Sequence, residues 1–565
     1  MKASNILLFF IILNFIGCKQ GVQTVSSYNI TKSVISDSAM VVSAHPLATE
    51  IGLAVLKDGG NAVDAAIAVQ FALAVCYPNA GNIGGGGFMV FRDKDGIVNT
   101  LDYREKASSL ATFDMYLDST GAAIPDKSMY GHLAAGVPGS VAGMVEAYEK
   151  YSQLKDWKRL IQPSIDLAAN GYKITSREAE NLNETQTKFV QYNLAPTAFH
   201  KDSWSEGDLM VQKELSQTLT AVRDHGRSGF YEGSVADFIV KEMRDGGGLI
   251  THEDLKNYQA VWRPAVTTMY RGHKIISMPP PSSGGIALTQ LLEMVEPYDL
   301  SSMKFQSAAA VHLITEAERR VYADRSFHLG DADFYPVPQK QLLDSTYLSE
   351  RMKDFDPRKA SKSEAIDHGI IETEQTTHYS IVDQLGNAVS MTTTLNGGYG
   401  AFTVVRGAGF ILNNEMDDFS VKPGSPNMYQ LIGAEANKIE PNKRMLSSMT
   451  PTIIEQDGKL KMVVGTPGGS TIITSVFQTI INVLDFGMDA DKAVQSPRFH
   501  HQWKPDVIMI EKDAVSLSER QILESIGHQF KERGSIGRVE AIVITADGKL
   551  HGAADRRGDD DAKGF

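Results

Sequence analysis

The chain has 565 residues, of which 42% are apolar and 22% are charged, and its 55 Lys and Arg against 68 Asp and Glu give a net charge of −13. This composition is ordinary for a folded protein with a large core, and it excludes a disordered or collagen-like chain. The acidic balance argues against a nucleic-acid partner, and two cysteines are too few for a disulfide scaffold or a thiolate-rich zinc site.

Residues 1–18 form a predicted export signal. Lys2 is followed by a largely apolar stretch of 12 residues, 6–17, which is too short to span a membrane and typical of a signal peptide. The stretch ends at Cys18 and resembles a bacterial lipoprotein signal, in which this cysteine becomes the lipidated N-terminus. We therefore expect an exported protein of the bacterial periplasm or cell envelope, bound to a membrane only through a lipid anchor. An ordinary signal peptide with an incidental cysteine is the alternative.

Residues 40–92 predict a strand, two helices and a second strand. Apolar residues within 45–56 recur with helical spacing, and the Ala-rich stretch 61–76 is almost wholly apolar, as in a buried helix. Cys76 is accordingly expected in the core rather than as a reactive thiol. The glycine-rich run at 81–87 follows a helix and leads into a strand. This order is the reverse of that in a dinucleotide-binding loop, so we reject such a site.

Helical patterns dominate residues 140–350, and the polar stretch 356–375 is typical of an exposed loop. The character of the chain then changes, because strand patterns prevail from Thr376 onward.

Two stretches, 376–383 and 387–396, predict a β-hairpin with a three-residue loop that ends at Gly386. In that register Thr376 lies opposite Thr394, so that two hydroxyl groups meet at the open end of the hairpin. Thr–Thr pairs are also common structural features of sheets, and the pattern alone does not make this pair a site.

Residues 451–464 and 539–554 predict two further hairpins, each with an Asp-Gly turn. The first leads through the glycine-rich turn 465–470 into a helix. Backbone N–H groups at such a helix start can hold a phosphate, a carboxylate or an oxyanion. The absence of Lys from the turn disfavours a nucleotide, and a simple tight connection is the alternative.

Motifs along nearly the whole mature chain resemble the γ-glutamyltransferases, which are also glutathione hydrolases. The most specific is TTHYSIVDQLGNAVSMTTTLNGGYG at 376–400. The others follow in the family's order and are NAVDAA (61–66), YRE (103–105), GVPGSVAG (136–143), NNEMDDFS (413–420), PNKRMLSSMTPT (441–452), GTPGGS (465–470) and SPRFHHQW (496–503).

The resemblance implies an α+β fold, the four-layer αββα sandwich of the N-terminal-nucleophile hydrolases. It also implies a precursor that cuts itself between Gln375 and Thr376. The products would be a large subunit of residues 19–375 and a small, catalytic subunit of residues 376–565, paired as a heterodimer.

The implied nucleophile is the hydroxyl of Thr376. A Thr hydroxyl is weakly nucleophilic until a base removes its proton, and cleavage creates an α-amino group with an ordinary pKa of about 7.7–8.0 on the same residue. By resemblance, Thr394 hydrogen-bonds the Thr376 hydroxyl. The N–H groups of Gly468 and Gly469 match the donors that stabilise the oxyanion.

The resemblance also implies a pocket for the α-carboxylate and α-ammonium of a glutamyl group. The matching residues are Arg104, Ser447 and Ser448 for the carboxylate, Asn396, Glu415 and Asp418 for the ammonium, and Tyr429, in a lid loop at 423–444, over the bound group. Each charged residue alone would more simply be a solvated surface group. Their combination across several motifs favours a binding site, in which the planar fork of Arg104 suits a carboxylate.

The implied reaction passes a γ-glutamyl group from glutathione or another γ-glutamyl compound to water or to an amino acid or dipeptide acceptor, without a cofactor or metal. His378, His500 and His501 are expected to be structural. Arg556 departs from the family's pattern, where Pro is expected, but lies outside the site motifs. Two alternatives remain: an acylase of the same fold for glutaryl or β-lactam side chains, and a lipid-anchored binding protein without catalysis.

Overall fold

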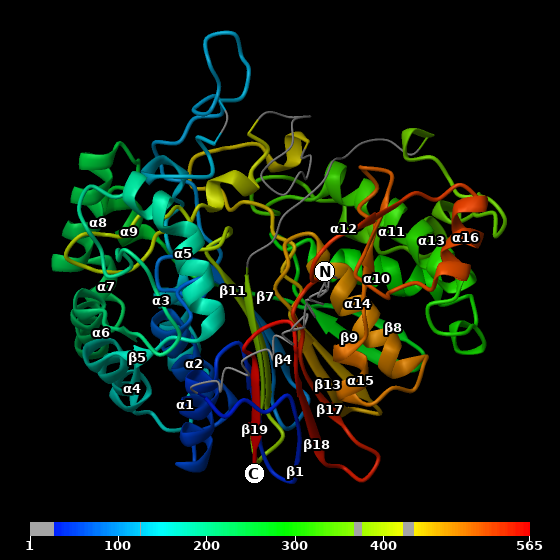
Figure 1. Cartoon of the computed structure of the whole chain (residues 1–565), viewed down its shortest axis with the longest axis horizontal. Helices are drawn as coiled ribbons and strands as arrows, with labels where there is room; N and C mark the ends of the chain where they lie inside the picture. Colours follow the sequence, from blue (N-terminus) through cyan, green and yellow to red (C-terminus); the bar gives the residue numbers. More distant parts are fainter. Residues whose placement is uncertain (1–27, 125, 366–375, 422–433) are drawn as a thin grey trace, which may run out of the picture.

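The computed structural model describes residues 28–124, 126–365, 376–421 and 434–565. Two seven-stranded antiparallel sheets pack face to face at the centre of the protein, and helices cover the outer face of each sheet (Figure 1). This arrangement confirms the predicted four-layer αββα sandwich.

Each sheet combines strands that precede Thr376 with strands that follow it. In order across the first sheet, the strands are β19 (Asp561–Gly564), β2 (Met40–Ser43), β10 (Thr377–Val382), β11 (Ala388–Thr394), β3 (Gly86–Arg92), β4 (Val98–Asp102) and β7 (Val261–Arg263). Those of the second are β1 (Ser33–Ser36), β18 (Leu550–Ala554), β17 (Glu540–Ile544), β13 (Lys459–Gly465), β12 (Thr452–Gln456), β9 (His273–Ser277) and β8 (Val266–Tyr270). Neither part of the chain therefore completes a sheet alone.

The helices form two groups, which Figure 1 shows on either side of the sheets. On the side of the first sheet lie α1 (Pro46–Lys57), α2 (Ala62–Cys76), α3 (Ser140–Tyr151), α4 (Trp157–Asn170), α5 (Ser176–Gln191), α6 (Lys213–His225), α7 (Ser228–Tyr231), α8 (Gly233–Gly246) and α9 (His252–Asn257). On the side of the second lie α10 (Gly284–Val295), α11 (Ala308–His328), α12 (Gln339–Leu342), α13 (Ser345–Arg351), α14 (Thr471–Leu484), α15 (Ala490–Gln495) and α16 (Leu517–Ser525). As expected, all of α2 is buried and Cys76 lies in the core.

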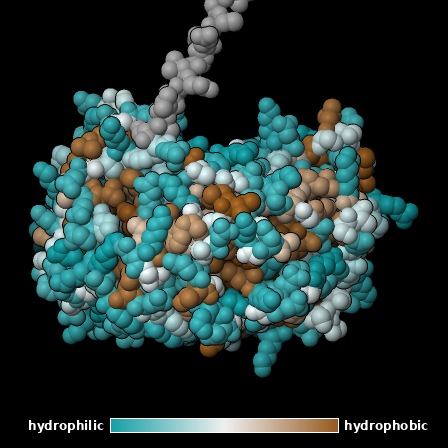
Figure 2. All heavy atoms as spheres, turned by 90° about the horizontal axis from the view of Figure 1, so that it is seen from below, coloured by the Kyte–Doolittle hydropathy of each residue, from teal (hydrophilic) through white to brown (hydrophobic). Residues whose placement is uncertain are grey.

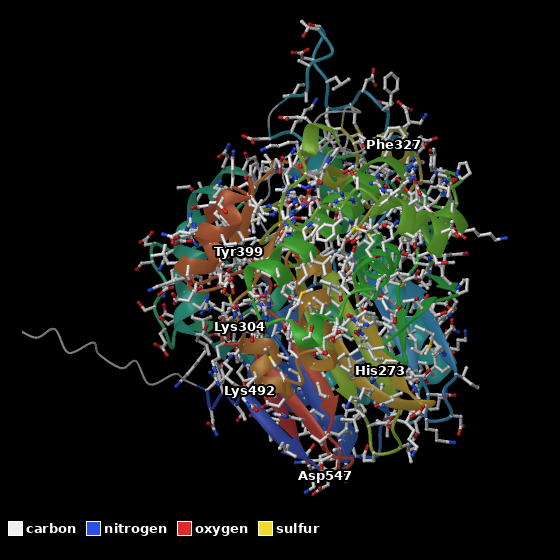
Figure 3. The ribbon with its side chains drawn as sticks, turned by 90° about the vertical axis from the view of Figure 1, so that its right-hand side faces the viewer. His273, Lys304, Phe327, Tyr399, Lys492 and Asp547 are labelled. Atoms are coloured by element: carbon white, nitrogen blue, oxygen red, sulfur yellow. The ribbon has the colours of Figure 1, made fainter. Side chains whose placement is uncertain are left out.

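The layer between the sheets is apolar at one end and polar at the other. Val42 and Val382 of the first sheet pack in one cluster with Ile453 and Ile542 of the second. Towards the end that holds Thr376, hydroxyl groups replace these side chains. The opposite end carries the β17–β18 turn, where Figure 3 labels Asp547, and its surface is mostly hydrophilic with smaller hydrophobic patches (Figure 2).

No helix among the described residues is long and apolar enough to cross a membrane.

The β10–β11 hairpin has the predicted register. Thr377 pairs with Thr393, and the loop residue Gly386 has the left-handed φ of 86° that the three-residue connection requires. The register places Thr376 next to Thr394, as the sequence predicts.

Asp383 fixes the loop of this hairpin and docks it onto α2. Its Oδ1 accepts the N–H groups of Leu385 and Asn387 at 2.9 and 3.0 Å, and its Oδ2 accepts the N–H of Ala62 at 2.9 Å. Because Asp383 is 2% exposed, water cannot readily replace these bonds.

We predict that Asp383→Ala lowers the free energy of unfolding by about 1–3 kcal/mol, because buried N–H groups lose their acceptor. Denaturation by urea measures the change. Asp547→Ala is the matched control: Asp547 also lies in a hairpin turn but is exposed, so a change within about 0.5 kcal/mol is expected. Equal effects of the two substitutions would contradict the role given to Asp383.

Candidate active site

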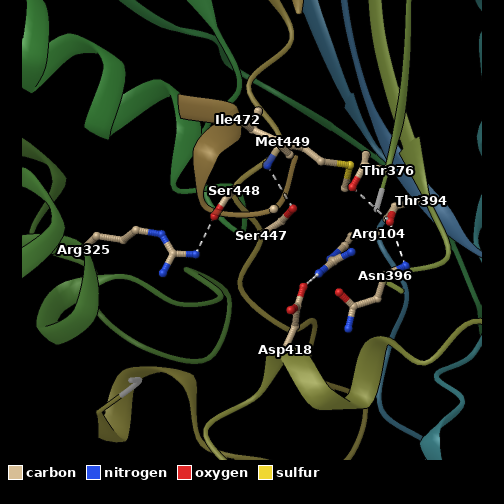
Figure 4. A pocket seen from close by; sticks show the side chains of 11 residues that line it. Arg104, Arg325, Thr376, Thr394, Asn396, Asp418, Ser447, Ser448, Met449 and Ile472 are labelled. Carbon is tan, nitrogen blue, oxygen red and sulfur yellow. Dashed lines mark hydrogen bonds and ion pairs between the residues drawn. The ribbon is translucent and has the colours of Figure 1, made fainter. Parts of the chain in front are cut away.

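Thr376 lies directly before β10 and faces Thr394, the last residue of β11 (Figure 4). Both residues are buried, and their hydroxyl oxygens are 3.5 Å apart. This distance is long for a hydrogen bond between hydroxyl groups, and such contacts often shorten only when substrate is bound. Thr394 Oγ1 also accepts the N–H of Asn396 at 2.7 Å, which orients the Thr394 side chain.

The glycine-rich run at 81–87 packs against this pair of residues. Asn82 Nδ2 donates to the carbonyl oxygen of Thr394 at 2.8 Å, and a Cβ atom on Gly85 would lie only 2.0 Å from the same oxygen. The run therefore lets the backbone approach the end of β11, which agrees with the rejection of a dinucleotide loop.

Gly468 and Gly469 lie in the turn between β13 and α14. Their φ values of 141° and 53° fall in the range that favours glycine. The N–H groups of Thr471 and Ile472 donate to the carbonyl oxygens of Gly468 and Gly469 at 3.0 and 3.2 Å, but the N–H groups of the two glycines meet no acceptor among the described residues. These N–H groups are suited to bind a developing negative charge.

Arg104 binds two of the predicted carboxylates directly. Its Nη1 lies 2.5 Å from Glu415 Oε2, and its Nη2 lies 2.5 Å from Asp418 Oδ2. The guanidinium also donates to the carbonyl oxygens of Met445 and Leu446, both at 3.3 Å. In this structure Arg104 and Asp418, predicted to bind opposite charges of a ligand, therefore form an ion pair (Figure 4).

Negative charge exceeds positive charge around Arg104. A third carboxylate, that of Glu105, lies 3.4 Å from Nη1, so one guanidinium faces three carboxylates with a formal sum of −2. Burial raises the pKa of Glu105 to about 7 and also raises the pKa values of Glu415 and Asp418, while Arg104 opposes the rise. A ligand that adds a positive charge here would lower the cost of keeping these carboxylates ionised.

Ser447 and Ser448 line the same cavity as Arg104 and Thr376. Ser447 Oγ accepts the N–H of Met449 at 3.2 Å, and Ser448 Oγ accepts a hydrogen bond from Arg325 Nη2 at 2.8 Å. Arg325 could not be predicted from the sequence, because a basic residue in the last turn of α11 is as typical of a helix end as of a binding site.

The cavity brings together eight of the predicted residues. It has a volume of about 300 Å³ including its opening, and Arg104, Thr376, Thr394, Asn396, Asp418, Ser447, Ser448 and Gly469 line it. Glu415 contacts Arg104 but does not line this cavity. Gly468 lines a second cavity that also reaches Thr376.

Four predicted features lie wholly or partly outside the described residues. Cys18, Gln375 and Tyr429 lie outside them, as does the lid loop up to residue 433. The described remainder of the loop contains Asn437, which is not among the predicted residues. Its Nδ2 donates to the Asp418 carbonyl oxygen at 2.6 Å and its Oδ1 accepts the Leu446 N–H at 3.0 Å, so it holds the segments of Asp418 and Leu446 together.

The three histidines of the sequence motifs are buried and hydrogen-bonded. His378 contacts the hydroxyls of Thr392 and Ser380 at 2.8 and 3.1 Å, and burial lowers its pKa to about 3. Burial likewise lowers the pKa of His500 to about 3 and that of His501 to about 4. His378 supports the hairpin, and His500, which contacts the hydroxyls of Ser470 and Thr474 at 3.3 and 2.8 Å, supports the start of α14.

One group of described residues has the composition of a metal site. His312, Glu316 and His528 have potential ligand atoms within 4.8 Å of one another. His312 Nδ1 already contacts His528 Nε2 at 2.7 Å, and Arg320 Nη1 donates to Glu316 Oε2 at 2.7 Å. Since these atoms satisfy one another, the group needs no metal to explain it.

Comparison with known proteins adds independent information. Residues 48–565 match the family model for gamma-glutamyltranspeptidase. The glutathione hydrolase proenzyme of Escherichia coli (strain K12) is 43% identical over 545 residues, which cover 95% of this chain and 94% of that protein.

Solved structures of other proteins are also similar to this chain. A cephalosporin acylase from Bacillus halodurans, 23% identical, superposes with a TM-score of 0.82 over 95% of this chain and 98% of its own, which shows the shared fold. The gamma-glutamyltranspeptidase of Helicobacter pylori is 45% identical with a TM-score of 0.56, and the match covers 60% of this chain and 97% of that one.

Proposed function

The chain belongs to the gamma-glutamyltranspeptidase family, and we propose that it is a self-processing γ-glutamyltransferase and glutathione hydrolase with Thr376 as its nucleophile. The observation that carries this proposal is the buried Thr376–Thr394 pair, beside a charged cavity on one side and the N–H groups of Gly468 and Gly469 on the other. Glutathione and other γ-glutamyl compounds are the donors, and water, amino acids or dipeptides are the acceptors.

Maturation breaks the bond between Gln375 and Thr376. The hydroxyl of Thr376 attacks its own preceding carbonyl, and Thr394 assists as a hydrogen-bond partner. The C–N bond to Thr376 breaks as an ester forms between the Gln375 carbonyl carbon and Thr376 Oγ1, and water then hydrolyses this ester to free the two fragments. Each sheet contains strands from both sides of this bond, so the two subunits stay together as a heterodimer after the cut. The matched Helicobacter pylori chain corresponds to 60% of this chain, close to the share of a large subunit of 357 among 565 residues (19–375).

The exposed α-amino group of Thr376 then acts as the base in turnover. It takes the proton from Oγ1 as this oxygen attacks the γ-carbonyl carbon of the donor, and it returns the proton to the leaving amine when the C–N bond breaks. The oxyanion formed on the way receives hydrogen bonds from Gly468 and Gly469. The resulting γ-glutamyl ester on Thr376 passes to water or to an acceptor amine.

The surplus of carboxylates around Arg104 supports a zwitterionic glutamyl head. The substrate's α-carboxylate binds the guanidinium of Arg104 and the hydroxyls of Ser447 and Ser448. Its α-ammonium binds Asp418, with Glu415 and Asn396 nearby, and places a positive charge beside the three carboxylates that face Arg104. Tyr429 covers the bound group.

The acylase alternative has less support. A glutaryl side chain has no ammonium group, so it would leave three buried carboxylates facing one guanidinium. The acylase ACY 1 proenzyme of Pseudomonas sp. (strain SE83) is 33% identical, whereas the glutathione hydrolase proenzyme of Escherichia coli is 43% identical. The intact Thr376–Thr394 pair gives a non-catalytic binding protein no support.

The export signal supports a lipid anchor at Cys18 and a place in the bacterial periplasm or cell envelope. A single acyl chain gives only marginal membrane binding, whereas two or more hold a protein stably. The catalytic part then works in an aqueous compartment next to the membrane.

We predict that the wild-type precursor separates into two fragments on a denaturing gel, whereas Thr376→Ala remains one inactive chain because it lacks the attacking hydroxyl. Thr377→Val is the control. The neighbouring Thr377 hydroxyl is buried without a hydrogen-bond partner among the described residues, so its loss should leave cleavage intact. A fully active wild-type enzyme that stays uncut would refute the proposed maturation.

We predict that Asp418→Ala lowers kcat/KM for γ-glutamyl anilides by about 30- to 4000-fold, since it strands a buried charged partner. Glutaryl anilides should be poor substrates of the wild type and lose much less. Asp418→Asn, which keeps the shape and removes the charge, should resemble Asp418→Ala. Comparable wild-type rates on both anilides, with a harmless Asp418→Ala, would identify an acylase instead.

We predict that Cys18→Ser moves the activity from the membrane fraction to the soluble fraction, because the acylated sulfur is lost. Fractionation and mass spectrometry of the mature N-terminus measure this. A soluble wild-type enzyme, or a mature chain that begins beyond Cys18, would rule out the anchor.

A further inference from the structure

The cavity that holds Arg104 contains a second cation, the guanidinium of Arg325. Arg325 lies in the last turn of α11 and is 4% exposed, and Figure 4 shows its side chain pointing toward Ser448. The binding mode described above gives this arginine no part in holding the donor. Its contacts indicate what that part is.

The guanidinium of Arg325 bridges two hydroxyl groups. Its Nη2 donates to Ser448 Oγ at 2.8 Å, and its Nε donates to Ser283 Oγ at 2.9 Å. Ser283 in turn donates both its N–H and its hydroxyl to the carbonyl oxygen of Ser447, at 2.7 and 2.6 Å. Arg325 therefore holds the Ser447–Ser448 segment at two points, once directly and once through Ser283.

These contacts determine what the two serine hydroxyls can still donate. A guanidinium has donors only, so Ser448 Oγ must be the acceptor in its contact with Arg325. Ser447 Oγ likewise accepts the N–H of Met449. Neither hydroxyl donates its own proton to an acceptor among the described residues. Both protons are thus available to a ligand in the cavity that the two serines line.

A carboxylate fits a pair of fixed hydroxyl donors, and a carboxamide does not. A carboxylate has two acceptor oxygens and no proton, so it can accept from both hydroxyls. A carboxamide accepts only through its oxygen, and its NH2 group would turn a donor toward the other hydroxyl. Without Arg325 the Ser448 hydroxyl could rotate and accept that N–H. A buried contact that holds the hydroxyl in one direction therefore favours the carboxylate.

The charge of Arg325 also acts within the site. Burial raises the pKa of Asp418, and the charges of Arg104 and Arg325 oppose the rise, so both cations influence this carboxylate. A carboxylate bound to the Ser448 hydroxyl would be separated from the Arg325 charge by that hydroxyl alone. Because hydrogen bonds in series polarise one another, the guanidinium makes the Ser448 hydroxyl a stronger donor.

The end of α11 is held in place by contacts on both sides of Arg325. One turn earlier, the Tyr322 hydroxyl donates to the carbonyl oxygen of Ser470, directly after the turn with Gly468 and Gly469. One residue later, the carbonyl oxygen of Ser326 accepts the N–H of Ala434 at 3.2 Å. The helix that presents Arg325 is therefore tied to the turn that supplies the oxyanion donors.

We propose that Arg325 is a positioning residue that acts through Ser448 and makes the site select donors with a free α-carboxylate over the corresponding carboxamides. Arg325 keeps Ser448 Oγ as an acceptor, so that the Ser448 proton is donated to one oxygen of the carboxylate. The proposal rests on the proposed γ-glutamyl transfer, whose donor carries this carboxylate.

The test compares the hydrolysis of two donors, a γ-glutamyl anilide and the same anilide with a carboxamide in place of the α-carboxylate. The wild type should prefer the acid. Arg325→Ala should lower kcat/KM for the acid about 10- to 100-fold, chiefly through a higher KM, because the lost contact serves binding. It should change kcat/KM for the amide less than about threefold. A loss of folded enzyme lowers both constants equally, so the acid-to-amide ratio reports selectivity alone.

Two further variants test the route through Ser448. In a Ser448→Ala background, Arg325→Ala should lower kcat/KM for the acid by less than about threefold more, because the hydroxyl that it positions is already gone. Arg325→Lys keeps a cation but lacks the planar fork that reaches both Ser283 and Ser448. It should also lower the acid-to-amide ratio, about threefold or more, and it replaces Arg325→Ala if that variant does not fold.

Arg351→Ala is the matched control. Arg351 pairs with Asp324, the neighbour of Arg325 on α11, at 2.9 Å, but it lines neither of the two cavities that reach Thr376. Its removal disturbs the same helix and should leave the acid-to-amide ratio within about twofold of that of the wild type.

Three results would overturn this inference while hydrolysis of the acid by the wild type still supports the proposed function. They are an unchanged ratio in the Arg325 variants, a full 10- to 100-fold loss on Arg325→Ala in the Ser448→Ala background, and an equal fall of the ratio in Arg351→Ala. A wild type that does not hydrolyse the γ-glutamyl anilide would overturn the proposed function and this inference with it.

Discussion

The pairing of β10 with β11 is the constraint on which the site depends. Successive residues of a strand point to opposite faces, so a slip of one residue would turn Thr376 away from Thr394. The left-handed Gly386 and the buried carboxylate of Asp383 fix the loop and with it the register. The hairpin is also central in its sheet, between β2 and β3, which lie before it in the chain. Its position is therefore determined by strands on both sides.

This placement reconciles self-cleavage with a stable core. A cut before Thr376 frees the start of β10, yet β10 keeps its hydrogen bonds to β2 and β11 along the strand. The new N-terminus then lies at the junction of two cavities. Arg104, Arg325 and Asp418 are the charged residues that line the first, and four arginines line the second.

Local features of the site could be predicted from the sequence, but the distant segments that pack against them could not. The hairpin, its loop and the glycine turn at 465–470 follow from short-range patterns that the structure reproduces. The four-layer arrangement came from the resemblance, because sheet order depends on pairings such as β19 with β2 that join distant parts of the chain. Period-two alternation carries no information about which distant strand lies alongside.

The contacts of the charged residues in the site could not be predicted from the sequence either. Arg104 and Asp418 were assigned to opposite ends of a ligand, but their ion pair joins residues 314 positions apart. Glu105 beside Arg104 and Asn437 behind Asp418 were not singled out, because a Glu in a loop or an Asn in a polar stretch has no distinctive pattern.

Trapping the acyl-enzyme tests most directly whether Thr376 is the nucleophile. The mature protein is mixed with a γ-glutamyl anilide, quenched in acid within one turnover and digested, and the peptides are weighed by mass spectrometry. We predict a mass increase of one γ-glutamyl group on the peptide that begins at Thr376, and hydroxylamine should release this group as expected for an ester. A γ-glutamyl group on any other residue, or turnover by a chain in which Thr376 is still joined to Gln375, would contradict it.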